Sequence, residues 1–150
     1  MTWLQYHKQS EQHACSADVA RFNRDFDRAK EFYRKAAEQE ELALAALDQN
    51  QKKGLGIISV SAAALWYKAG QYDHARELAI HWLGTSLLPE FAVNQLQELV
   101  AEVDRIEKLL EDVEEWRASL SVSSSDRDLL VKAVEQWKAS AGKATLSYQA

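Results

Sequence analysis

The chain has 150 residues, of which 47% are hydrophobic and 27% are charged, with one proline and five glycines. This balance suits a single globular domain over 1–150 and excludes a disordered chain, and the scarcity of proline and glycine favours long helices over a sandwich or barrel. The formal net charge of −5 disfavours general nucleic-acid binding, because an acidic chain repels phosphate backbones.

The sequence also carries signals about cellular location. It begins with polar residues instead of the apolar core of a signal peptide, and no stretch reaches the ~18 to 20 apolar residues that span a bilayer. Cys15 is the only cysteine, which excludes an internal disulfide. We therefore expect a cytoplasmic protein without membrane association.

The N-terminal half predicts an arm followed by a long helix. Residues 1–17 are mixed polar around Trp3, and we expect them to form a flexible or docking arm. Ser16 can cap a helix that starts at Asp18 and continues to about Leu47, because apolar residues recur there at three- and four-residue steps. A polar run over 48–54 ends this helix.

The C-terminal half predicts further helices. A strongly apolar helix covers 57–69, and after Gly70 a second helix covers 71–83. Pro89 opens a long helix to about Leu120, residues 121–125 read as a serine-rich linker, and a last helix follows before a frayed tail at 142–150. The sequence therefore predicts an all-α fold of about five helices.

The segment 57–83 resembles a tetratricopeptide repeat (TPR). The resemblance lies in a small residue and an aromatic on the first helix, a turn glycine, then an aromatic and an alanine on the second: Ala63, Trp66, Gly70, Tyr72 and Ala75. The second helix departs from the family pattern at two positions. Ala79 stands where the family has a large aromatic residue, and Trp82 stands where it has a small one. The family's closing proline has only Pro89 as a candidate, about two residues later than the family pattern places it.

A weaker echo of the same repeat lies upstream, where Phe26, Ala29, Tyr33 and Ala36 follow the aromatic and small order of a second helix. Its turn position is Arg24 instead of glycine, and its distance from the later unit exceeds the family's ~34-residue period. The resemblance implies TPR-like antiparallel hairpins with a long C-terminal helix; an irregular helical bundle is the alternative fold.

The resemblance further implies a concave groove formed by the first helices of the hairpins, which in this family binds peptides. By position, the groove residues are expected to be Ile57, Val60, Ala64, Tyr67 and Lys68. The lysine and asparagine with which some family members bind a carboxylate are replaced by Val60 and Ala64, so an apolar occupant is expected. That occupant is either a partner segment or the chain's own long helix.

The long helix carries a heptad pattern with two interpretations. Its apolar positions are Leu96, Leu99, Val103, Ile106, Leu110 and Val113. They form either one face of an intramolecular bundle or the seam of a homodimer.

No motif in the sequence indicates catalysis. His74 and His81 are seven residues apart, about 10 Å along a helix, which is too far for one metal ion. We expect no catalytic residue, cofactor site or metal site, and interpret the chain as a non-enzymatic protein-interaction or assembly module. The alternative is a helical-bundle ligand-binding protein or enzyme whose site has no recognisable sequence signature.

Overall fold

The computed structural model of the protein describes residues 1–120 and 124–144. Within these ranges the chain forms six α-helices and no strand, which confirms the all-α prediction. The helices are α1 (Trp3–Phe22), α2 (Phe26–Ala46), α3 (Lys52–Lys68), α4 (Tyr72–Leu83), α5 (Glu90–Ser119) and α6 (Ser124–Ala144).

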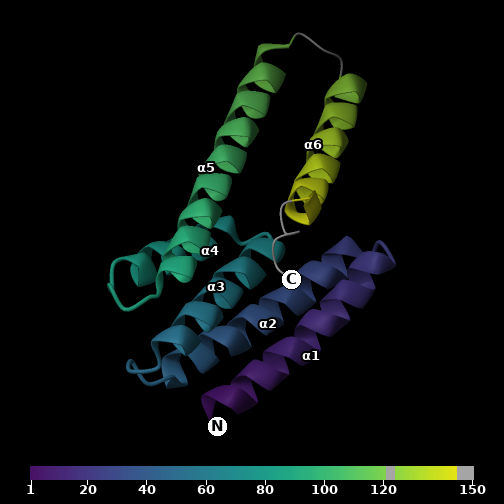
Figure 1. Cartoon of the computed structure of the whole chain (residues 1–150). Helices are drawn as coiled ribbons and strands as arrows, with labels where there is room; N and C mark the ends of the chain where they lie inside the picture. Colours follow the sequence, from purple (N-terminus) through teal and green to yellow (C-terminus); the bar gives the residue numbers. More distant parts are fainter. Residues whose placement is uncertain (121–123, 145–150) are drawn as a thin grey trace.

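The first four helices pack in chain order as antiparallel neighbours, α1 on α2, α2 on α3 and α3 on α4 (Figure 1). The first part of α5 packs on both α3 and α4, and α6 returns alongside α5 so that its C-terminal end reaches α3 (Figure 1). Of the described residues, none belongs to a helix both long and apolar enough to cross a lipid bilayer.

The N-terminal segment is helical, so the expected arm over 1–17 is corrected to most of α1. The helix starts with a capping box, in which the Thr2 hydroxyl accepts from the Gln5 amide at 3.3 Å and the Gln5 side chain accepts from the Thr2 amide at 2.7 Å. Ser16 is not a cap: it lies inside α1, where its hydroxyl donates to the Gln12 carbonyl at 3.2 Å.

Two turns of the same geometry separate α1 from α2 and α3 from α4. Each has one residue in the left-handed region, Arg24 with φ of 60° and Gly70 with φ of 76°. That residue donates its amide to the carbonyl three residues earlier, and the next residue donates to the carbonyl five residues earlier, which is the Schellman pattern. The donor and acceptor pairs are Arg24 to Arg21, Asp25 to Ala20, Gly70 to Tyr67 and Gln71 to Trp66, all at 2.9 to 3.0 Å.

The core between these helices is rich in alanine. The fully buried alanines come from every one of the first five helices: Ala17, Ala36, Ala37, Ala43, Ala62, Ala63, Ala64, Ala75, Ala79 and Ala92. Because a methyl group keeps two helix axes close, these contacts give a thin core into which a few large side chains, such as Tyr67 and Leu96, are inserted.

Gly56 marks the closest contact between α3 and the start of α5. A Cβ atom there would lie 2.8 Å from Cγ of Pro89 and 3.1 Å from Cβ of Ala92. This approach brings Phe91, one residue before Ala92, to the edge of α3.

The long helix α5 has two different halves. The heptad positions Leu96, Leu99, Val103 and Ile106 are buried in the chain's own core, so they do not lie on a free surface. Beyond Ile106 the helix has no buried residue. The heptad pattern continues there with two half-buried residues, Leu110 and Val113.

The helix α6 packs less tightly than the others. Leu129 is 62% exposed and Trp137 is 38% exposed, and Trp116 on the facing end of α5 is 53% exposed. Of the predicted linker 121–125, residues 124 and 125 belong to α6, and 121–123 lie outside the described residues. Of the predicted frayed tail, residues 142–144 belong to α6, and 145–150 also lie outside the described residues.

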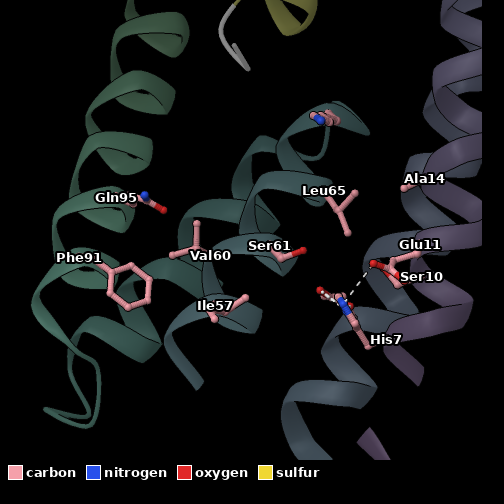
Figure 2. A pocket seen from close by; sticks show the side chains of 12 residues that line it. His7, Ser10, Glu11, Ala14, Ile57, Val60, Ser61, Leu65, Phe91 and Gln95 are labelled. Carbon is pink, nitrogen blue, oxygen red and sulfur yellow. Dashed lines mark hydrogen bonds and ion pairs between the residues drawn. The ribbon is translucent and has the colours of Figure 1, made fainter. Parts of the chain in front are cut away.

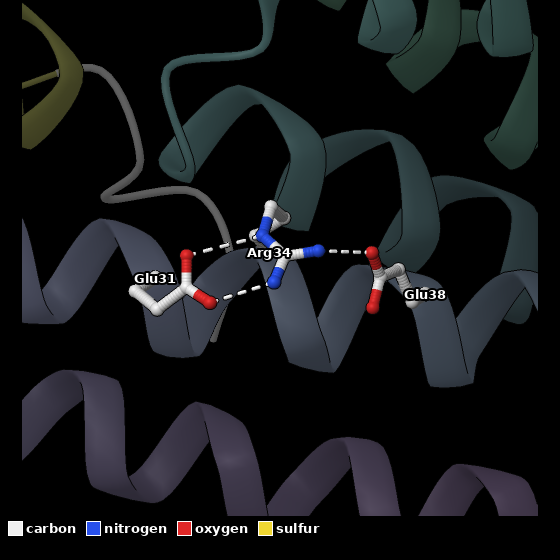
Figure 3. A network of polar contacts seen from close by, with 3 residues as sticks. All are labelled: Glu31, Arg34 and Glu38. Carbon is white, nitrogen blue, oxygen red and sulfur yellow. Dashed lines mark hydrogen bonds and ion pairs between the residues drawn. The ribbon is translucent and has the colours of Figure 1, made fainter.

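The outer face of α2 carries an exposed ion-pair network centred on Arg34 (Figure 3). Its guanidinium donates to both carboxylate oxygens of Glu31, at 2.6 and 3.1 Å, and to Glu38 one turn later. The hydrogen bond from Arg34 lowers the pKa of Glu31. Exposed pairs of this kind contribute little to folding stability, so we interpret this face as a solvated one.

Candidate functional site

A groove of about 330 Å³ lies between α1, α3 and α5, with one residue of α2 reaching its floor. Figure 2 shows the side chains that line it, coming from both sides of the hollow. They are His7, Ser10, Glu11 and Ala14 of α1, Glu40 of α2, Ile57, Val60, Ser61, Leu65 and Lys68 of α3, and Phe91 and Gln95 of α5. Its volume lies at the lower end of the range typical of ligand pockets.

The floor of the groove holds a histidine paired with a buried carboxylate. The Glu40 carboxylate is 0% exposed, and its two oxygens lie 3.0 and 3.1 Å from Nδ1 of His7. With Glu40 ionised, Nδ1–H of His7 donates, because a carboxylate only accepts. A buried carboxylate is costly unless it is paired, so Glu40 requires His7.

The second ring nitrogen of His7 faces another carboxylate. Nε2 lies 3.5 Å from Oε1 of Glu11, which is exposed at the rim of the groove. The His7 ring therefore lies between two carboxylates.

The opposite end of the groove is cationic. Lys68 lies eleven residues after Ile57 on α3, ~16 Å along the helix axis. Its Nζ atom sits 5.5 Å from the centre of the Tyr33 ring. Burial lowers the pKa of Lys68, and the nearby Arg21 lowers it further, while the Asp18 carboxylate raises it.

Tyr33 and Asp18 form the polar support of that end. The Tyr33 hydroxyl donates to Oδ1 of Asp18 at 2.5 Å. Burial raises the pKa of Tyr33, and the hydrogen bond to Asp18 raises it further, so the phenol keeps its proton. Between the two charged ends, the walls are apolar, with Ile57, Val60, Leu65 and Phe91 facing the hollow (Figure 2).

The structure places three of the five expected groove residues at the groove. Ile57, Val60 and Lys68 line it, whereas Ala64 and Tyr67 are buried in the core. Tyr67 packs its ring on Tyr72, with the centroids 5.2 Å apart. The groove face of α3 is rotated toward Ser61 and Leu65, because α4 and α5 cover the side on which Ala64 and Tyr67 lie.

The long helix does not fill the groove. It supplies one wall through Phe91 and Gln95, near its N-terminal end. Its heptad residues from Leu96 to Ile106 instead pack on α3 and α4, so a homodimer through that seam would require α5 to leave the core.

The site residues that sequence reasoning missed come mainly from α1 and α2. His7, Ser10 and Glu11 fall in the segment expected to be an arm, and Glu40 went unnoticed. One signal was available: Glu40 is three or four residues from Ala36, Ala37, Ala43 and Leu44, all buried, so it occupies the core-facing stripe of α2. A carboxylate in such a stripe indicates a buried partner.

The histidines considered for metal binding do not join this site. His74 is exposed, with Nε2 2.6 Å from Oε1 of Glu41, and His81 is exposed with its ring edge-on to Trp82. Over the described part of the chain, no group of three histidine, cysteine, aspartate or glutamate side chains is arranged to hold a metal ion.

Comparison of the chain with models of known protein families, with curated proteins and with solved structures gives no match. The function proposed below is therefore inferred from the residues and geometry of the groove.

Proposed function

We propose that the protein is a non-enzymatic interaction module with a TPR-like scaffold, and that it binds a segment of a partner protein in the groove. The observation that carries this proposal is the origin of the groove walls. They come from α1, α3 and α5, alternate helices of the chain, and the TPR family binds peptides on the face formed by such first helices.

The two Schellman turns support the repeat interpretation. After each turn an aromatic residue opens the second helix, Phe26 in one and Tyr72 in the other. Three residues later comes an alanine, Ala29 or Ala75, which is buried against the first helix. The equivalent positions lie 46 residues apart, so the units would be degenerate repeats with a long connection.

The groove chemistry defines the expected ligand segment. An apolar side chain fits the middle, between Val60, Leu65 and Phe91. An acidic group fits the end at Lys68, and a basic group fits the rim at Glu11. Charges at the two ends would fix the direction in which the segment lies, while apolar burial would supply most of the affinity.

The test is site-specific photo-crosslinking followed by a binding measurement. A photoreactive amino acid at Val60 should capture the partner in the native cell, and the same amino acid at Lys35, on the exposed side of α2, should not. A recombinant segment of the captured protein should then bind at least ~10-fold more weakly to Ser61→Arg, because a long side chain fills the groove.

The matched control is Ser16→Arg, which puts the same side chain on an exposed position of α1 outside the groove. It should bind like the unmodified protein. Equal binding by both variants, or equal capture from Val60 and Lys35, would contradict the proposal.

A small-ligand-binding protein or enzyme is the second candidate, favoured by the buried His7–Glu40 pair at the groove floor. It predicts that a low-molecular-weight compound, without any partner protein, raises the melting temperature and that Ser61→Arg abolishes this effect. Thermal denaturation with fractionated small molecules from cell extract separates the two candidates.

A further inference from the structure

A second cavity, of about 30 Å³, lies where α1, α2, α3 and α6 meet, and it is lined by four cationic side chains. These are Arg21 of α1, Lys30 of α2, Lys68 of α3 and Lys138 of α6. Among the lysines whose exposure the structure describes, Lys30, Lys68 and Lys138 are the three that are half-buried, and all three line this one cavity. Half-buried lysines from three different helices are thus brought together.

Among the described residues, this cluster lacks matching negative charge. The carboxylate that acts on it there is Asp18: its Oδ1 lies 3.9 Å from a terminal nitrogen of Arg21, and its charge acts on Lys68. Within the described residues, no ion pair involves Lys30, Lys68 or Lys138. In a chain with a net charge of −5, four cationic side chains line a single cavity, and the Asp18 carboxylate acts on two of them, Arg21 and Lys68.

The backbone turn at Gly70 helps to shape the cavity. Gly70 lines it, and the Lys30 side chain crosses this turn, with Cε 3.6 Å and Nζ 3.8 Å from the place of an added Cβ. The Asp18 carboxylate is already engaged, since it accepts the Tyr33 hydroxyl at 2.5 Å. Asp18 thus supplies one negative charge beside four cationic side chains.

We propose that this cavity binds a phosphate-type oxyanion, held by Arg21, Lys30, Lys68 and Lys138. A phosphate carries a charge of about −1.5 to −2 at neutral pH and accepts several hydrogen bonds, which matches an excess of cationic donors. The cavity exceeds the ~10 to 15 Å³ that one water requires. It suits a small oxyanion, or the phosphoryl end of a larger molecule whose remainder stays outside.

Binding would also connect α6 to the other helices. Lys138 comes from α6, which has no buried residue among those described, whereas the other three cations belong to α1, α2 and α3. An anion coordinated from all four helices would oppose the separation of α6 from this end of α3. This inference does not rest on the proposed groove function.

The test is titration of the full chain with inorganic phosphate and, separately, with phenyl phosphate, at constant ionic strength in chloride. Calorimetry should show saturable binding with a Kd in the millimolar range or tighter. Lys30→Gln and Lys138→Gln should each weaken it ~10-fold, the effect of removing one charge-assisted hydrogen bond. The control Lys132→Gln, on the exposed surface of α6, should bind as the unmodified chain does.

The two ligands distinguish the sources of the phosphoryl group. If inorganic phosphate binds and phenyl phosphate does not, the site takes a free anion. If phenyl phosphate binds more tightly, the site takes the phosphoryl group of a monoester. A second measurement covers the case in which a variant fails to fold. In the unmodified chain, either ligand should shift the NMR amide signals of Gly70 and Ala139, both at the cavity.

Three results would overturn the inference. These are no saturable response to either anion, an equal loss of binding in Lys132→Gln, and amide shifts that leave Gly70 and Ala139 unaffected.

Discussion

Arg24 and Gly70 hold the same position in two turns 46 residues apart, both in the left-handed region, with φ of 60° and 76°. Glycine adopts this conformation without a steric penalty, whereas a residue with a Cβ is strained there. The left-handed position is therefore strained in the first turn, where it is Arg24, and unstrained in the second turn, where it is Gly70.

Exchanging these residue types should move stability in opposite directions. Arg24→Gly should stabilise the protein by up to ~1 kcal/mol, because release of strain exceeds the added entropy of the unfolded chain. Gly70→Ala should destabilise it by about 1 to 2 kcal/mol. Urea denaturation midpoints measure both changes. A loss of stability in Arg24→Gly would show that Arg24 makes contacts that outweigh its strain.

Gly56 and Gly54 predict a second pair of opposite effects. Gly56→Ala should destabilise the protein by about 1 to 3 kcal/mol, although alanine favours helices, because its Cβ would meet the rigid ring of Pro89 at 2.8 Å. Gly54→Ala should be neutral or stabilising by up to ~1 kcal/mol, since its nearest neighbour is the flexible end of Leu47 at 3.4 Å. Thermal melts of the two variants check this, and similar effects at both sites would contradict the close approach of α3 and α5.

The His7–Glu40 pair predicts a non-additive double mutant. His7→Leu should cost about 2 to 4 kcal/mol, because it leaves a fully buried carboxylate without its partner. The double variant His7→Leu, Glu40→Met should recover most of that loss, since an apolar pair needs no compensation. Denaturant unfolding of the two single variants and the double variant measures the coupling. Additive losses would mean that the two side chains do not interact.

Glu107 predicts a pH-dependent change in stability. Burial raises its pKa, and a hydrogen bond to Asp73 and the charges of Asp73 and Asp104 raise it further, while Arg76 opposes them. The folded state therefore binds this proton more tightly than the unfolded state. The resulting stabilisation is present below the ordinary pKa of 4.5 and is lost as pH rises through the folded pKa.

Glu107→Gln should accordingly stabilise the protein at pH 7, by less than ~1 kcal/mol because the side chain is only half-buried, and should make no difference near pH 4. Urea unfolding at the two pH values tests this. The control Glu111→Gln, one turn later on the exposed surface, should not show the same pH dependence. A larger effect of Glu107→Gln at pH 4 than at pH 7 would contradict the prediction.

The helices could be predicted from the sequence where large apolar residues form their buried face. The helix α4 and the start of α5 after Pro89 fall close to their predicted bounds, whereas α3 ends as predicted but begins at Lys52, five residues earlier than expected. The first helix was missed because its buried positions are small, Ser10, Ala17 and Ala20, so it has almost no apolar periodicity. Its boundary was hidden as well, because the turn has Arg24 where a glycine would signal it.

The groove was predictable only along α3. Ile57, Val60 and Lys68 are among the positions that the TPR resemblance assigns to the groove on one predicted helix, and all three line it. The pair at the floor joins two residues 33 positions apart, and that proximity arises from the packing of α1 on α2. The choice between Ala64 and Leu65 depends on the rotation of α3 about its axis, which the helices packed around it determine.

Because α5 is one continuous helix, the number of residues between two of its side chains fixes the distance between them along the axis. Phe91, 41% exposed at the groove, and Trp116, 53% exposed near the far end, are 25 residues apart on one helix, ~38 Å along its axis. Each residue inserted between Ile106 and Trp116 would increase the distance from Phe91 to Trp116 by ~1.5 Å and rotate the indole by ~100° about the helix axis. The buried half of α5 would stay unchanged, so the reach of this helix can vary independently of the core that anchors it.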